Sequence, residues 1–161
     1  MTFNKSSPGF RTTRHLALSG MLASQLAQNR GKAEIELSDY VGSCYIADPN
    51  RFLSFWSDPL TCIEALRLEC DLEDPAWTYQ WKLTQEVKSA VADRENGWAF
   101  PYSDDLAASL LRAAELSHVS ESEPQIDLAH FLLAISSDSR FAQVFATGFR
   151  VDLARDWVKK R

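Results

Sequence analysis

The chain has 161 residues, of which 45% are hydrophobic, so it is long enough for one domain with a buried core. Six glycines and six prolines are too few for an all-β or a disordered chain, and the plentiful alanine and leucine favour helices. The net charge is −5, with five basic residues and no acid before Glu34 and 19 acids against 6 bases from Glu34 to Asp127. This distribution argues against a nucleic-acid-binding protein, which would have a basic stripe, and it allows a protein partner steered by charge.

Residues 10–70 predict a first group of helices. Phe10 is followed by Thr12 and Thr13, which are candidate N-caps for a helix of small and aliphatic residues. The segment 35–48, IELSDYVGSCYIAD, predicts a second helix. NRFLSFWSDPL, residues 50–60, predicts a short helix that leads into a closing one.

An insert of about residues 71–101 follows, and it contains a predicted helix that begins near Asp74. Trp77 and Trp81 are four residues apart and therefore lie on one side of this helix. If they pack over the junction of the flanking segments, they belong to the core. If they face outward with Tyr79, they form an aromatic patch suited to a partner helix or an extended peptide.

The last group of helices is predicted over residues 102–158. Tyr102 precedes Ser103, which is a candidate N-cap for a long amphipathic helix. The segment 126–138, IDLAHFLLAISSD, predicts the next helix, with Asp127 as its N-cap. His130 lies in its first turn, where we expect a structural role: a hydrogen bond to a neighbouring group and a ring packed between helices.

The two groups of helices resemble each other at a period of about 90 residues. The matching pairs are Ile35 with Ile126, Leu37 with Leu128, Tyr40 with Phe131, and Arg51-Phe52 with Arg140-Phe141. The sequence therefore predicts an all-α fold in one domain, residues 1–161. It is a tandem repeat of two four-helix units, about 10–70 and 102–158, with the helical insert between them.

This pattern resembles the amino-terminal domain of the Clp ATPases, which is a tandem repeat of four helices. In that family the second helix typically begins Ile-x-Thr-Glu-His-Leu-Leu, and Ile126, His130, Phe131 and Leu132 match it. The segment 148–158 resembles the family's closing Gly-Val-Asp-x-x-x-Leu. The resemblance implies a protein-interaction module that binds a peptide, or that docks to a AAA+ unfoldase or its protease as adaptor or modulator.

Three departures from the family bear on function. The family's Glu before His is Ala129 here, and the matching position in the first half is Ser38. In some relatives that pair of Glu residues binds a phosphorylated arginine, so we do not expect this activity. His130 has Asp39 as its counterpart, and the insert is longer than the family's linker. No GxxxxGK[ST] motif occurs, so the chain carries no ATPase module. It is either a separated domain of a larger protein or, as we expect, a stand-alone relative.

We expect no enzyme activity, because His15, His118 and His130 lie on different predicted elements without a partner pattern. The three cysteines form no CxxC pair, so we expect neither a metal site nor another cofactor, but free thiols in a cytoplasmic protein. No apolar run approaches the roughly 20 residues of a membrane span.

The candidate binding residues are Thr12, Thr13, Ser38, Trp77, Trp81 and Ser103, and the candidate structural residues are Phe10, Tyr102 and His130. The resemblance places the threonines and Ser103 beside the family's peptide groove, although they also suit helix caps. Two other functions stay open: an accessory component of a larger machine such as a type VI-like secretion apparatus, and an acidic inhibitor or immunity-type protein. The sequence does not identify the partner.

Overall fold

The computed structural model describes residues 11–77, 101–117 and 125–159. These residues are mostly helical, which confirms the predicted all-α character. The helices are α1 (Arg14–Asn29), α2 (Leu37–Ala47), α3 (Pro49–Leu53), α4 (Pro59–Glu69), α6 (Asp104–Leu116), α7 (Leu128–Ile135), η1 (Ser139–Phe141), α8 (Ala142–Phe145) and α9 (Val151–Lys159). Phe10, Trp81, His118 and most of the predicted insert lie outside the described residues.

Side-chain caps fix where several helices begin. Asp48 and Asp58 accept hydrogen bonds from Arg51 N and Thr61 N at 3.1 and 3.3 Å, and a proline follows each aspartate at the first helical position of α3 and α4. Proline suits that position because its missing N–H group would have no partner within the helix. Asp127 caps α7, as the sequence predicts.

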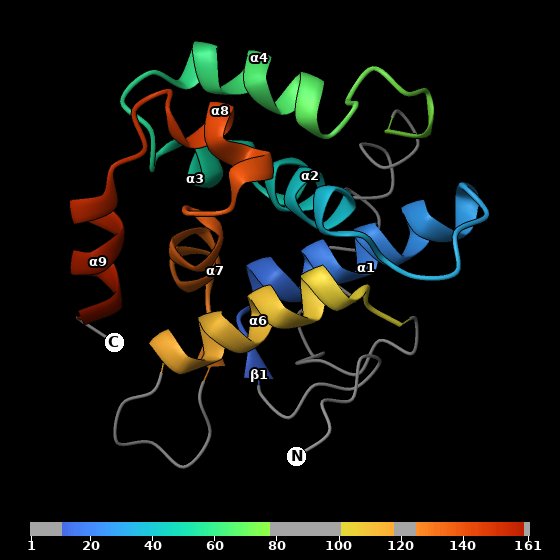
Figure 1. Cartoon of the computed structure of the whole chain (residues 1–161), viewed down its shortest axis with the longest axis horizontal. Coiled ribbons are helices and arrows are strands. Elements are labelled where there is room, and N and C mark those ends of the chain that lie inside the picture. Colours follow the sequence, from blue (N-terminus) through green and yellow to red (C-terminus); the bar gives the residue numbers. More distant parts are fainter. Residues whose placement is uncertain (1–10, 78–100, 118–124, 160–161) are drawn as a thin grey trace.

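The core is organised around α7, a short and almost fully buried helix. It packs against α6 and α9, and Figure 1 shows it between these two helices, while α4 and α9 lie at the outer edge. Phe131 of α7 is 0% exposed, and its ring meets the ring of Tyr40 on α2 edge-on at 5.1 Å. An all-round apolar helix of this kind is stable only when other helices cover every face.

A second, smaller group of buried side chains lies between α1 and α2. We call it the α1–α2 cluster; its members are Ala17, Leu18, Leu22, Leu26, Ile46, Ala47 and Trp77. Trp77 is 1% exposed, so burial is the correct one of the two alternatives for this residue. Its side chain is not part of a surface aromatic patch.

Two pairs of backbone hydrogen bonds connect distant parts of the chain. In the first pair, Thr13 N donates to Ile126 O, and Ser103 N donates to Ile35 O, each at 2.9 Å. The first bond accompanies the parallel pairing of β1 (Arg11–Thr12) with β2 (Gln125–Ile126), and the second accompanies a separate parallel bridge between Ile35 and Tyr102.

The second pair joins the segment that links α3 to α4 with the segment that links α8 to α9. Ser57 N donates to Gly148 O at 2.8 Å, and Arg150 N donates to Phe55 O at 2.7 Å. The indole Nε1 of Trp56 also donates to Val144 O at 2.9 Å. The segment after α3 is therefore joined to the segment after α8 by main chain and side chain together.

The structure also bears on the membrane and cysteine expectations. None of the helices within the described ranges is long and apolar enough to cross a membrane. Cys44, Cys62 and Cys70 are buried free thiols. Burial raises the pKa of the Cys44 thiol to about 12, so it is not a ready nucleophile at neutral pH.

Candidate functional site

A surface groove lies where α2 and α6 begin, and we call it the α2–α6 groove. It has a volume of about 770 Å³ and is lined by residues of the segment before α2, both helix starts, the end of α4, and η1. It brings together Ser38 and Ser103, two of the candidate binding residues that the sequence places far apart. Its apolar lining residues are Leu37 and Phe141, which are both buried, and Ala33, which is exposed.

The backbone beside the groove is held by main-chain hydrogen bonds. Ile35 N donates to Pro101 O at 2.8 Å, and Ser103 N donates back to Ile35 O. Ile35 is fully buried and Tyr102 is 4% exposed, so both anchor this crossing in the core. A groove supported in this way keeps its shape before a ligand arrives, which lowers the entropic cost of binding.

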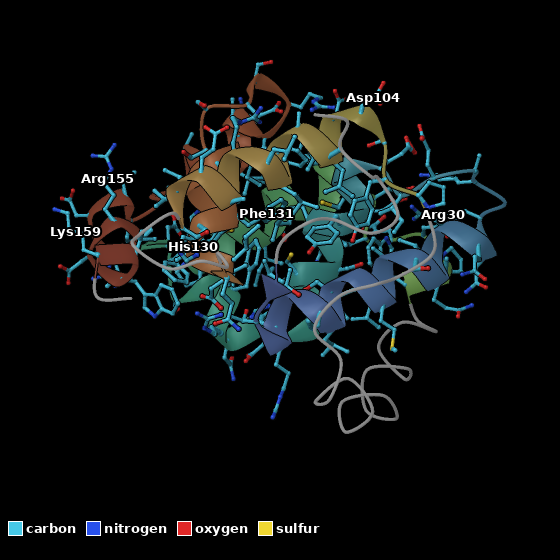
Figure 2. The ribbon with its side chains drawn as sticks, turned by 90° about the horizontal axis from the view of Figure 1, so that it is seen from below. Arg30, Asp104, His130, Phe131, Arg155 and Lys159 are labelled. Atoms are coloured by element: carbon cyan, nitrogen blue, oxygen red, sulfur yellow. The ribbon has the colours of Figure 1, made fainter. Side chains whose placement is uncertain are left out.

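The charges of the groove are unbalanced. Its carboxylates are those of Glu34, Glu36, Glu69, Asp104 and Asp105, and its cations are Lys32 and Arg140. Figure 2 shows Asp104 near the top of the view, away from Arg155 and Lys159 at its left edge. Because carboxylates outnumber cations, the groove attracts positive charge.

Both cations of the groove are already engaged with carboxylates. Lys32 Nζ lies 2.5 Å from Glu36 Oε1 and 3.0 Å from Asp39 Oδ2. Burial opposes the charge of Lys32, but the hydrogen bonds to Glu36 and Asp39 outweigh it and raise the pKa of Lys32. Arg140 binds Asp105 Oδ2 at 2.6 Å and Asp138 Oδ2 at 2.8 Å.

The two serines of the groove differ in their engagement. Ser103 caps α6, as expected, with its Oγ accepting a hydrogen bond from Leu106 N at 3.3 Å. Ser38 lies half-buried in the first turn of α2, and the N-cap of that helix, Glu36, makes no side-chain cap. Unsatisfied first-turn N–H groups of a helix favour a hydrogen-bond acceptor on a ligand.

Thr12 and Thr13 do not line the groove. Thr12 lies in β1, and Thr13 is the N-cap residue of α1 but makes no side-chain cap. Thr13 therefore has the predicted N-cap position, but its hydroxyl does not cap the helix, and Thr12 is not the N-cap. Instead, the Thr13 hydroxyl donates to Asp127 Oδ1 at 2.7 Å, a bond that the charge of the acceptor strengthens.

Asp127 belongs to a polar network that the sequence did not predict. The guanidinium of Arg51 binds both carboxylate oxygens of Asp127, and its Nη1 lies 3.2 Å from His15 Nδ1. Because arginine can only donate, His15 Nδ1 accepts, and His15 Nε2 donates to Cys44 O at 2.9 Å. The bonds of this network join α1, α2, α3 and α7, which is a structural role.

His130 is a structural residue in this fold. Its Nδ1 accepts a hydrogen bond from Asp127 N at 2.9 Å, which completes a capping box at the start of α7. Its ring meets the Trp157 ring edge-on at 5.9 Å, so it packs between α7 and α9. The first-turn position of His130 was the signal from which this arrangement could be predicted.

The comparisons with known proteins leave this geometry as the main guide to function. No family model, curated protein or solved structure matches the chain. Among the described residues, no group of histidine, cysteine, aspartate and glutamate is arranged to hold a metal ion.

Proposed function

We propose that the chain is a non-enzymatic protein-interaction module of the Clp amino-terminal type, which binds a peptide segment in the α2–α6 groove. The observation that carries this proposal is the groove itself, which joins Ser38 and Ser103 over an apolar lining of Leu37 and Phe141. A concave site with apolar walls and a few polar groups is the usual form of a peptide or small-molecule site.

The proposal includes a duplicated architecture with a spacing of about 90 residues between matching positions. Paired hydrogen bonds support it. If Thr13 corresponds to Ser103 and Ile35 to Ile126, then the bond Thr13 N to Ile126 O is the same contact as Ser103 N to Ile35 O. Each bond occurs once from either half, as expected for two units related by an approximate two-fold axis.

The second pair of backbone bonds is of another kind. Ser57 N to Gly148 O and Arg150 N to Phe55 O are the two reciprocal bonds of the antiparallel bridge between Trp56 and Phe149, so they join the two halves without testing the correspondence.

The order of the helices is a further support for the proposal. α1, α2, α3 and α4 are 16, 11, 5 and 11 residues long, and α6, α7, α8 and α9 are 13, 8, 4 and 9, with η1 just before α8.

The charge of the groove favours a basic peptide segment. Glu34 and Glu69 have no cation within salt-bridge distance among the described residues, while Lys32 and Arg140 are already held by carboxylates. A lysine or arginine side chain of a ligand would therefore meet carboxylates, and an acidic ligand would be repelled.

A titration with matched peptides tests the groove. We expect a peptide with alternating lysine and leucine to bind more tightly than its glutamate counterpart, with an affinity that falls as salt rises, because salt screens exposed charges. The variant Glu34→Gln/Glu69→Gln should weaken binding roughly tenfold, since each lost charge contact contributes up to about 1 kcal/mol. Asp152→Asn/Glu115→Gln removes the same net charge outside the groove and should leave the affinity unchanged.

A second variant tests the shape of the groove. Ser38→Trp fills the space next to Leu37 and should abolish binding while the far-ultraviolet circular dichroism stays as in the wild type. If each peptide bound Ser38→Trp as tightly as it binds the wild type, the groove would be rejected as the binding site.

The proposed adaptor role has its own test. Immobilised protein should retain a Clp-type AAA+ ATPase or its protease. Soluble wild-type protein should compete for the retained partner, and soluble Ser38→Trp should compete less well. Retention of neither, together with intact peptide binding, would reject the adaptor role and keep the peptide site.

A further inference from the structure

The α1–α2 cluster is closed by one buried residue from outside the two helices. Its other buried members come from α1 and α2, and Trp77 comes from the segment after α4, where the partly buried Leu72 and Ala76 also pack against the cluster. The ring of Trp77 lies so close to α2 that a Cβ atom built on Gly42 would be 2.7 Å from Trp77 Cη2. Trp77 therefore acts as a plug on an apolar surface that α1 and α2 form together.

Charged side chains hold this plug at its edge. The Arg30 guanidinium lies over the Trp77 ring, with 5.5 Å between Cζ and the ring centroid. Arg30 Nη1 donates to Asp39 Oδ1 at 2.7 Å, and Arg30 Nη2 lies 2.9 Å from Asp74 Oδ2. Asp74 also accepts a hydrogen bond from Ala76 N at 2.9 Å, which fixes the turn just before Trp77.

This joint contains most of the unsatisfied buried polar atoms of the described chain. Within the described ranges, buried side-chain nitrogen or oxygen atoms lack a hydrogen-bond partner at four positions: Arg30 Nε, Arg30 Nη2, Ser43 Oγ and Trp77 Nε1. Three of the four lie at the contact of Arg30 with Trp77. Arg30 Nη2 keeps its ion pair with Asp74, but the geometry is not that of a hydrogen bond.

Buried polar groups in folded proteins are nearly always hydrogen-bonded, because an unpaired donor loses its water without a replacement. The closed position of Trp77 is therefore less favourable than its burial alone suggests. A cavity of about 160 Å³ between Trp77, Leu72, Ile63 and Tyr45 shows that its packing is also incomplete on one side.

Trp56 provides the contrast within the same molecule. It is 3% exposed, its Nε1 donates to Val144 O at 2.9 Å, and its ring stacks on Phe52 at 4.9 Å. Trp56 belongs to the main core, whereas Trp77 belongs to the separate α1–α2 cluster. The two indoles are similarly buried, but the Nε1–H of Trp56 has an acceptor and that of Trp77 has none.

We infer that Trp77 is a releasable plug: it leaves the α1–α2 cluster by local opening while the main core stays folded, and so it controls access to an apolar face of α1 and α2. In the closed state the occupant of this face is Trp77 of the same chain. Local opening of this kind draws on the least stable contacts of a fold, and the unpaired donors of this joint identify it as such a contact. The inference is independent of the α2–α6 groove.

Hydrogen exchange of the indole N–H groups tests this inference on the full-length protein. With ¹⁵N-labelled tryptophan, Trp77→Phe and Trp56→Phe assign the two Nε1–H signals. We expect Trp77 to exchange at least about 100-fold faster than Trp56, at a rate that hardly depends on low concentrations of urea, as for local opening. Equal rates with the same urea dependence would show that Trp77 opens only with the whole core, and would overturn the inference.

Gly42→Ala adds a test that removes no native contact. The new methyl group lies in the space of Trp77, so the exchange of Trp77 should accelerate further, while that of Trp56 stays unchanged. Ser43→Ala on the same helix adds no atom and removes a buried hydroxyl without a partner, so it serves as the control in which neither indole exchanges faster than in the wild type. If Gly42→Ala accelerates both indoles equally, the plug and the core open as one unit and the inference fails.

Discussion

Arg51 and Asp127 form a two-point ion pair between α3 and the start of α7. Arg51 Nη1 lies 3.2 Å from Asp127 Oδ1, and Nη2 binds the other carboxylate oxygen. The side chain of Asp127 is 5% exposed and that of Arg51 is 29% exposed. Because Thr13 also donates to this carboxylate, Asp127 connects the start of α1, α3 and α7.

The ion pair predicts a large effect of Asp127→Ala on stability. The change removes the cap of α7 and leaves Arg51 and the Thr13 hydroxyl without their acceptor. We expect the free energy of unfolding to fall by about 3 kcal/mol, the lower end for a broken buried pair, because Arg51 is partly exposed. Urea unfolding followed by circular dichroism measures this difference.

Asp48→Ala is the matched control for that experiment. Asp48 caps α3 through Arg51 N, but it is exposed, so its loss should cost only about 1 kcal/mol. If the two variants were equally destabilised, capping alone would explain the effect of Asp127, and the ion pair would contribute nothing.

The same network predicts how stability depends on pH. Burial lowers the pKa of His15 below its usual 6.5, and the nearby charge of Arg51 lowers it too. Below about pH 6.5 the unfolded chain therefore binds a proton that the folded chain does not, so stability falls as pH falls. His15→Gln should remove this loss between pH 7 and 5 in urea unfolding.

Asp127 adds a second loss at lower pH. Burial alone would raise its pKa, but the hydrogen bond and charge of Arg51 and the hydrogen bond of Thr13 hold the pKa below its usual 3.8. Its stabilising contribution is complete well above that value and disappears as pH falls through the folded pKa. Asp127→Asn should flatten the stability profile below about pH 4 and leave the loss near pH 6 in place.

Local patterns were enough to predict the helical elements and several of their ends. Asp127 and Ser103 are N-caps as their sequence positions indicate, since each precedes an apolar helical pattern. Thr13 shows the limit of this reasoning: it occupies the N-cap position, but its hydroxyl bonds to a residue 114 positions away. A distant acceptor leaves no trace in local sequence.

The polar networks and the groove could not be predicted for the same reason. His15 had no partner at short range, and its partners Cys44 and Arg51 are 29 and 36 positions away. The sequence pairs Arg51 with Arg140, and both bind carboxylates: Arg51 binds Asp127 and Arg140 binds Asp105. The identity of each carboxylate depends on how α3 and η1 pack, which the local sequence does not indicate. Ser38 and Ser103 were predicted as binding residues singly, not as neighbours.

Thr13 and Ser103 are each the N-cap residue of a helix, but their hydroxyls make different contacts, and this difference predicts different mutational behaviour. Ser103→Ala removes the cap of α6 and should cost about 1 kcal/mol, while Ser103→Asn should restore it. Thr13→Val keeps the shape but leaves Asp127 with one donor fewer, so the pKa of Asp127 should rise, whereas Thr13→Asn should not rescue it. Carboxyl ¹³C shifts of Asp127 against pH distinguish the two cases.

Gly148 predicts a steric and a conformational effect that can be separated. Its φ of 95° is one that L-residues rarely adopt, and a Cβ at this position would lie 2.1 Å from Ser57 Oγ. Gly148→Ala should therefore lower the free energy of unfolding by more than about 2 kcal/mol, since backbone strain alone costs 1–3 kcal/mol. The added clash lies beside two backbone hydrogen bonds, from Ser57 N to Gly148 O and from Arg150 N to Phe55 O.

Two further variants separate these contributions. Gly31 has a φ of 68°, and no atom lies within 4 Å of a Cβ built there, so Gly31→Ala reports backbone strain alone. It should lower the free energy of unfolding by about 1 kcal/mol. Ser57→Ala/Gly148→Ala removes the clashing oxygen and should recover part of the loss of Gly148→Ala, which gives a positive coupling in the double-mutant cycle. Additive effects of Ser57→Ala and Gly148→Ala would contradict the close approach of these two segments.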